Sequence, residues 1–218
     1  MAQFFIALHN NLGMLFWGAE MTVLISGAAI LLGVPFGLLL CFGIVSRSRA
    51  LRGVSTAYQS LWRGTPILVQ LLIIYSLLPI AGINVPPIIA AILALTMNTT
   101  AFQAEIFRGG YLAIPSGQME AARMVGIRKS AATVHILVPQ MFRLVTPSLV
   151  NEAISILKNS SLVSVIGVTE LMRVSQQVVA ATYRPFEIYI IAGAIYVIVN
   201  LGLSVLGRAA ESQLRQRV

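Results

Sequence analysis

The sequence predicts an all-α integral membrane protein with five transmembrane helices, in a single domain that takes in residues 1–218. Three observations predict this fold class. Hydrophobic residues make up 57% of the chain, charged residues make up only 10%, and several charge-free stretches are long enough to cross a bilayer. A soluble domain carries about 25% charged residues. The composition therefore excludes an ordinary soluble enzyme and a disordered chain, because too few charges remain to solvate so much apolar surface.

The first and last spans follow from two separate charge-free stretches. Residues 21–46 contain no charged side chain, and about 20 apolar residues suffice to cross a bilayer. We therefore expect the first span at about residues 19–46. Residues 188–207 are likewise uncharged and predict the fifth span at about 187–208. Residues 1–13 lack the basic segment of a cleaved signal peptide, so we expect this N-terminal region to be retained.

The second and third spans share one charge-free stretch, residues 64–104. Its 41 residues are too many for one crossing, and turn-forming residues interrupt it near the middle. These are Pro79, Gly82, Asn84, Pro86 and Pro87. We expect a helical hairpin, with spans at about residues 60–81 and 86–107.

The fourth span is less uniform than the others. Residues 144–169 are apolar apart from Glu152 and Lys158, which predicts a span at about 143–168. The preceding segment, about 109–142, is less hydropathic and contains signals for two helices. Pro115 and Ser116 favour a helix start, Gly126 favours a left-handed stop, and a second helix can begin near Ser130.

The basic residues predict the orientation of the spans. With five spans, 12 of the 15 Lys and Arg residues fall on one side, which the positive-inside rule makes cytoplasmic. They are Arg47, Arg49, Arg52, Arg63, Arg108, Arg123, Arg128, Lys129, Arg143, Arg208, Arg215 and Arg217. Only Arg173 and Arg184 lie on the other side, and Lys158 lies in the membrane. The N-terminus is expected outside and the C-terminus in the cytoplasm, and the pI near 10.4 needs no nucleic-acid partner.

A motif in the long cytoplasmic loop resembles a known family. Glu120-Ala121-Ala122 is followed after three residues by Gly126, and after nine more by Ile-Leu-Val-Pro at residues 136–139. This order resembles the loop of the membrane-spanning permease subunits of ATP-binding cassette importers, with a valine where the family has leucine. The chain looks most like the polar amino acid branch, which serves substrates such as histidine, arginine, lysine and glutamine. Further motifs carry that likeness: Arg-Gly-Thr-Pro at 63–66, Phe-Gln-Ala-Glu-Ile-Phe-Arg-Gly-Gly at 102–110, Ile-Pro-Ser-Gly-Gln at 114–118 and Lys-Asn-Ser-Ser-Leu at 158–162.

The resemblance implies a fold and a set of partners. The fold is that of a type I importer permease, with a cytoplasmic coupling helix in the loop at about 109–142. The loop helix would dock into a pair of cytoplasmic ATPase subunits through Gly117, Glu120, Ala121, Ala122, Arg123 and Gly126. The other implied partners are a second permease subunit, identical or related, an extracytoplasmic amino acid-binding protein and the lipid of the bacterial cytoplasmic membrane.

ATP and Mg²⁺ are expected on the partner ATPase. The sequence contains no Gly-x4-Gly-Lys-Ser/Thr loop, which NTPases of that class use to hold nucleotide phosphates. We therefore expect a transport subunit with no cofactor of its own, no metal site and no catalytic residue. A membrane-embedded enzyme is disfavoured because no metal-binding cluster, nucleophile motif or clustered carboxylates appear.

Polar side chains at membrane depth are the candidates for substrate contact, because ionisable groups are costly there. On the fourth span, helical spacing aligns Ser148, Asn151, Glu152, Ser155, Lys158 and Asn159. Since the resembling family transports amino acids, we expect Glu152 to attract an ammonium group or a basic side chain, and Lys158 to attract a carboxylate. Asn98 and Ser155 would complete the hydrogen bonding, and Phe102 would pack against the substrate.

Other interpretations of these residues stay open. The polar groups of the spans can instead join helices to one another. An ion-coupled secondary carrier that uses Glu152 as its coupling site is the alternative function. Glu105 and Arg108 are interpreted as a structural pair, Cys41 as a packed small residue, and His9 and His135 as interfacial residues. Trp17 and Trp62 fit an aromatic belt, and Arg47, Arg49 and Arg52 fit contacts with lipid headgroups.

Overall fold

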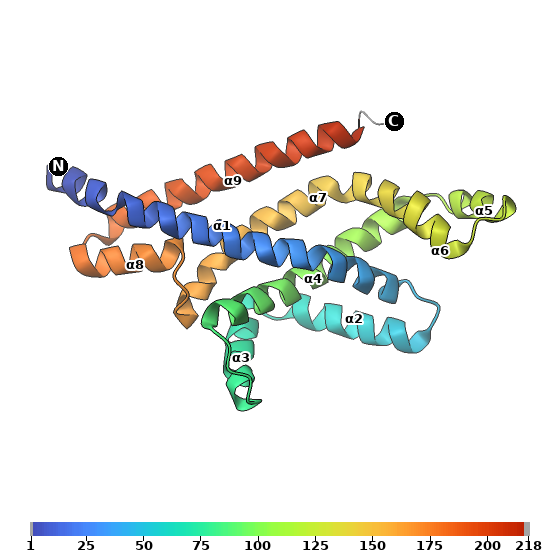
Figure 1. Ribbon diagram of the computed structural model, residues 1–218, viewed down its shortest axis with the longest axis horizontal. Coiled ribbons are helices and arrows are strands. Elements are labelled where there is room, and N and C mark those ends of the chain that lie inside the picture. The colour runs from blue at the N-terminus through green and yellow to red at the C-terminus, as the bar shows by residue number, and fades with distance from the viewer. Residues whose placement is uncertain (1, 216–218) are drawn as a thin grey trace.

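Proline and glycine divide the chain into the helices of the computed structural model, which describes the backbone of residues 2–215 and the side chains of residues 11–213 (Figure 1). The helices are α1 (Ala2–Ile44), α2 (Arg49–Gly64), α3 (Ile67–Ile80), α4 (Pro87–Ala113), α5 (Gly117–Met124), α6 (Lys129–Ala132), α7 (Val138–Asn159), α8 (Leu171–Thr182) and α9 (Pro185–Arg215). A π-helical turn joins α6 to α7, and a short 3-10 helix at Ser160–Ile166 follows α7. No β-strand occurs within residues 2–215. His9 and Arg217 lie outside the described side chains.

Four helical stretches among the described residues are long and apolar enough to cross a membrane. They are Asn11–Ile44, Pro87–Ala113, Lys129–Ile166 and Pro185–Gln213. The pair α2 and α3 adds a fifth if it forms one broken span. This arrangement confirms the predicted all-helical membrane fold.

The segment expected as the second span, residues 60–81, is not one continuous helix in the structure. The structure breaks it at Thr65 and Pro66, and α2 and α3 meet at an angle of 110°. Pro66 has no N–H to continue the hydrogen-bond ladder of α2, and its ring disfavours helical geometry at the preceding residue. With 14 residues, α3 is about 21 Å long. It is shorter than the roughly 30 Å hydrocarbon core. Hydropathy alone did not locate this bend.

Side-chain amides donate hydrogen bonds to the backbone carbonyl groups at this bend. Gln70 Nε2 donates to the carbonyl oxygens of Trp62 at 2.7 Å and Thr65 at 3.0 Å, and also to Thr65 Oγ1 at 2.7 Å. Asn98 Nδ2 of α4 donates to Gln70 Oε1 at 2.8 Å and to the Trp62 carbonyl at 3.5 Å. The last carbonyls of a helix lack partners within the helix, so these amides cap the end of α2 in place of water.

Glycines let α1 approach α4 closely along their length. A Cβ atom at Gly33 would lie 2.6 Å from Thr99 Cγ2, and one at Gly37 would lie 2.9 Å from Gln103 Cβ. Apolar burial drives helix association weakly in lipid, because lipid tails are as apolar as the side chains. Small residues spaced four apart therefore contribute through close van der Waals contact, which fixes the position of α1 against Thr99 and Gln103.

A buried carboxylate joins α1, α8 and α9. Helix α8 lies toward the end of the molecule that holds the N-terminus (Figure 1). Glu170, fully buried, precedes α8 and accepts hydrogen bonds from the backbone N–H groups of Met172 and Arg173. Thr22 of α1 and Tyr196 of α9 donate to its Oε2 at 3.2 and 2.9 Å. These four donors stabilise the carboxylate and hold α8 between α1 and α9.

Candidate functional site

A row of polar side chains crosses the apolar interior between α7, α4 and α1. Glu152 of α7 is half-buried, and its Oε1 accepts a hydrogen bond from Thr99 Oγ1 of α4 at 3.0 Å. Gln103 Nε2 donates to the same Thr99 hydroxyl at 3.2 Å and to the carbonyl of Ile30 in α1 at 3.4 Å. The Glu152 carboxylate therefore has a hydroxyl partner that the Gln103 amide holds in turn, and no basic residue of the described part of the chain is in hydrogen-bond contact with it.

The row retains unused hydrogen-bonding capacity. Gln103 Oε1 is buried and has no hydrogen-bond partner among the described residues. Leaving such an acceptor unpaired costs about 1–3 kcal/mol. Gln103 Oε1 can therefore accept a hydrogen bond from a polar ligand without the loss of an existing bond.

Arg63 and Phe102 lie beside this row. The Arg63 guanidinium carbon stands 5.4 Å from the centre of the Phe102 ring, within cation–π range. Phe102 follows Thr99 by one turn of α4. The structure thus brings a cation of α2 and an aromatic ring of α4 together, one turn from the Thr99 hydroxyl that contacts Glu152 of α7. From the sequence, Arg63 is an orientation signal and part of the Arg-Gly-Thr-Pro motif, and its contact with Phe102 depends on the packing of α2 against α4.

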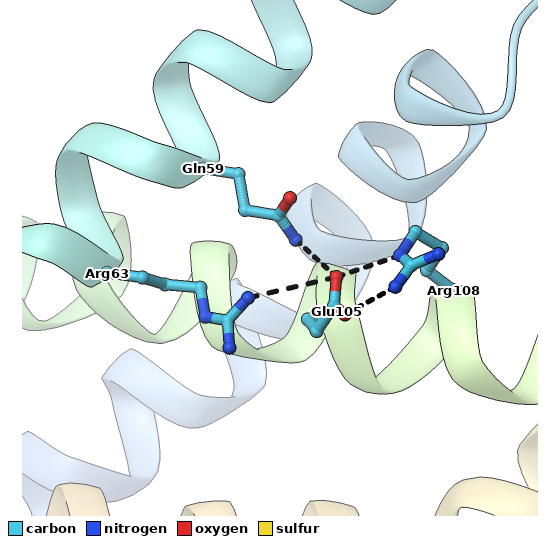
Figure 2. A network of polar contacts seen from close by, with 4 residues as sticks. All are labelled: Gln59, Arg63, Glu105 and Arg108. Carbon is cyan, nitrogen blue, oxygen red and sulfur yellow. Dashed lines mark hydrogen bonds and ion pairs between the residues drawn. The ribbon is translucent and has the colours of Figure 1, made fainter.

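Glu105 is the centre of a second polar network, in which it binds side chains of α2 and α4 through hydrogen bonds and ion pairs (Figure 2). Arg108 Nε and Nη2 donate to the two Glu105 oxygens at 2.9 and 2.6 Å, so the expected pair is present and bidentate. Gln59 Nε2 of α2 donates to Glu105 Oε2 at 2.9 Å, and Arg63 Nη1 lies 3.8 Å from the same oxygen. The network joins the two helices. No sequence pattern points to Gln59, because it lies on another helix, 46 residues from Glu105.

The predicted substrate residues separate into two groups. Glu152, Ser155 and Phe102 flank the polar row, and Ser155 is half-buried one turn beyond Glu152 on α7. Asn98 is 4% exposed, and its amide nitrogen already donates a hydrogen bond to Gln70 Oε1 at the bend. Lys158 is exposed on α7 and makes no ion pair within the described residues. Among the described residues, neither Asn98 nor Lys158 makes a hydrogen bond or ion pair with Glu152.

The loop motif forms helix α5, at the opposite end of the molecule from the N-terminus (Figure 1). Glu120, Ala121 and Arg123 are exposed, whereas Ala122 is buried at 4% and anchors the helix. Gly126 ends the helix with φ of 79°, the left-handed geometry that its sequence position predicted.

Helix α5 is connected to both sides of the polar row. It follows α4 after a short turn, and α6 with its π-helical turn leads from it into α7. Gln140 Nε2 of α7 also donates to Gln118 Oε1 of α5 at 2.7 Å. A displacement of α5 therefore reaches the helices that carry Thr99 and Glu152. Residues 114–137 separate α4 from α7 and lie inside the segment expected as the loop, about 109–142.

Comparisons with known proteins agree with this architecture. The family described as binding-protein-dependent transport system inner membrane component matches residues 29–216. The chain is 37% identical over 199 residues to the arginine transport system permease protein ArtQ of Bacillus subtilis, covering 91% of each chain. It is 34% identical over 211 residues to the glutamine transport system permease protein GlnP of Escherichia coli, covering 96% of each.

A solved structure matches the whole fold. The crystal structure of an amino acid ABC transporter with histidines superposes with a TM-score of 0.86 at 37% identity, over 96% of this chain and 98% of that one. These findings confirm the predicted type I importer permease fold and a transport subunit that is not itself an enzyme. The chain belongs to the family of binding-protein-dependent transport system inner membrane components, the multi-pass permease subunits of ATP-binding cassette importers.

Proposed function

We propose that this permease forms half of the pathway of an importer for a polar L-amino acid. Relatives that cover more than 90% of the chain are named for arginine and glutamine transport, which supports an amino acid substrate. The assembly would contain two permease subunits, two cytoplasmic ATPases that bind ATP and Mg²⁺, and an extracytoplasmic binding protein that delivers the substrate. The N-terminus and α8 would face outward, and α5 would face the cytoplasm. The relatives do not favour the ion-coupled carrier considered from the sequence.

The polar row is the proposed substrate site, and the Thr99–Glu152 contact is the observation that carries this assignment. Glu152 would attract the substrate ammonium group or a basic side chain. Arg63, which lies over the Phe102 ring, would receive the carboxylate, with Lys158 of α7 as the second candidate cation. Phe102 would pack against the alkyl part of the substrate, and Ser155 would add a hydrogen bond. The opposite charges of Glu152 and Arg63 suit a zwitterion.

Coupling would follow from the two connections of α5. Closure of the ATPase pair would move the helix that carries Glu120, Ala121, Ala122 and Arg123, while Gly117 and Gly126 delimit it. Because α5 leads into both α4 and α7, the same movement would change the spacing between Thr99 and Glu152. Two conformations that bind the ATPases differently would then differ in their affinity for substrate, which is what transport requires.

The test is transport by the complete complex in proteoliposomes. The purified permease–ATPase complex, with its binding protein, would be assayed for uptake and for ATPase stimulation with each amino acid. Glu152→Gln should weaken half-saturation at least ~tenfold for the amino acid that stimulates the wild type, a change of about 1.4 kcal/mol. Glu187→Gln, at the start of α9, is the matched control and should resemble the wild type. Unchanged affinity and specificity in Glu152→Gln would remove Glu152 from the site, and uptake without any ATPase would refute the proposed function.

A further inference from the structure

A cavity of about 830 Å³ lies where α1, α4 and α5 meet, away from the polar row. Its walls come from the end of α1 and the turn after it, the end of α4, helix α5, and the segment of α6 with its π-helical turn. We call it the interfacial cavity. The site proposed for the substrate contributes no residue to it.

The charges that line the interfacial cavity are mainly positive. Arg47 follows α1, Arg123 lies on α5, and Lys129 begins α6, so three separate segments each contribute one cation. Glu120 is the acidic residue among the lining side chains. In the described part of the chain, both ion pairs involve Glu105, so none of these three cations is neutralised by a carboxylate in contact. The cavity therefore carries uncompensated positive charge that favours an anion.

Part of the remaining wall is apolar, beside hydroxyl side chains such as Ser46 and Thr133, and lies at the expected edge of the membrane. Phe42 from α1, Leu112 from α4 and Leu137 next to α7 line the cavity. The candidate spans of α1 and α4 end at Ile44 and Ala113, directly beside it. A ligand that uses all of these walls has an anionic head and an apolar body. Basic pockets between transmembrane helices on the cytoplasmic side are typical binding sites for anionic lipid headgroups.

We propose that the interfacial cavity binds an anionic phospholipid of the cytoplasmic leaflet. The phosphate oxygens accept hydrogen bonds from Arg47, Arg123 and Lys129, and the upper acyl chain packs against Phe42 and Leu112. The proposal rests on the orientation given under the proposed function, with α5 in the cytoplasm. Free phosphate carries a similar negative charge but would not contact the apolar side chains of the cavity. The lining therefore favours a lipid over free phosphate.

Such a lipid would link the coupling helix to α1. Arg123 and Lys129 move with α5 and α6, whereas Arg47 moves with α1. A phosphate shared among them stabilises the conformation in which the three cations are close together. The lipid therefore shifts the balance between conformations by its difference in affinity for them.

The experiment measures lipid retained by the complete permease–ATPase complex. The complex is equilibrated in nanodiscs of phosphatidylcholine with about a fifth phosphatidylglycerol, and bound lipid is counted by native mass spectrometry. The site variant is Arg47→Gln with Lys129→Gln, which leaves Arg123 of the coupling surface unchanged. The control, Arg128→Gln with Arg143→Gln, removes the same charge from exposed positions outside the cavity. Each basic residue near an anionic surface contributes roughly a factor of five, so the site variant should retain phosphatidylglycerol roughly 30-fold more weakly.

The outcomes distinguish a bound lipid from a soluble anion, and they are read independently of the proposed function. Phosphatidylglycerol retained by the wild type and the control, and lost from the site variant, supports the proposal. Equal retention by all three proteins overturns it. A second arm titrates inorganic phosphate in pure phosphatidylcholine nanodiscs and follows thermal stability. Stabilisation there that depends on Arg47 and Lys129 overturns the lipid assignment in favour of a soluble anion. Lipid retention is measured without any transport assay. A failure of the lipid proposal can therefore be told apart from a failure of the proposed amino acid uptake.

Discussion

Substitution of Gly33 by alanine should disturb the polar row through one methyl group. The added Cβ would lie 2.6 Å from Thr99 Cγ2 and 3.1 Å from Gln103 Oε1. Carbon atoms pack at about 3.5–4.0 Å, so α1 and α4 must separate, or Thr99 must turn away, by about 1 Å. The Thr99–Glu152 hydrogen bond, now 3.0 Å, would then stretch to about 4 Å, beyond hydrogen-bonding range.

The expected cost of this substitution is about 1–3 kcal/mol of stability, the range for overpacked interiors. The assay is the thermal unfolding midpoint of the purified complex together with the substrate dependence of uptake. Gly33→Ala should lower the midpoint and raise the half-saturation concentration. Gly27→Ala is the control on the same helix, because a Cβ there meets nothing within 4 Å. If the two variants behave alike, close packing of α1 on α4 does not position Thr99.

Three further predictions concern other parts of the molecule. Glu105→Gln leaves Arg63 and Arg108 without a counter-charge, so it should reduce thermal stability by about 1–3 kcal/mol, read as a lower unfolding midpoint. Gly126→Ala places a Cβ at φ of 79°, which costs about 1–2 kcal/mol, so ATPase activity should respond less to substrate. Glu170→Gln replaces one acceptor oxygen with a donor facing donors, so α8 should exchange its backbone amides faster in hydrogen–deuterium exchange.

Each of these predictions has a matched comparison. Glu187→Gln removes an acid that takes part in neither network, and a midpoint as low as that of Glu105→Gln would contradict the role given to the Glu105 contacts. Gly109→Ala adds a methyl group in open helical space, so an equal loss of substrate response would show that the geometry at Gly126 is immaterial. Unchanged exchange in α8 after Glu170→Gln would mean that packing alone holds that helix.

The sequence predicted the features that depend on local composition. Charge-free runs locate the helices around residues 21–46 and 188–207, because lipid admits few charges. The Glu105–Arg108 pair follows from their spacing on one helical turn, and Gly126 follows from the rarity of left-handed geometry in other residues.

The features that hydropathy missed depend on contacts between distant segments. The bend at Pro66 brings Arg63 toward Phe102 and sets Asn98 at the end of α2, whereas a count of apolar residues treats residues 60–81 as one span. Gln59 reaches Glu105 only because α2 lies against α4. Of the candidate substrate residues, Glu152 could be named from its cost in the membrane, but its partner Thr99 depends on how α4 and α7 pack.

The amide caps at the bend between α2 and α3 make that bend independent of hydration. A pathway that opens alternately to the two sides of a membrane is wetted and dried in every cycle, and a bend whose carbonyls relied on water would change shape with each change of exposure. Gln70 and Asn98 provide the bend with donors that stay in place throughout. Because these donors belong to the protein, the proposed alternation of exposure would leave the direction of α3 unchanged, and α3 would serve as a fixed wall of the pathway.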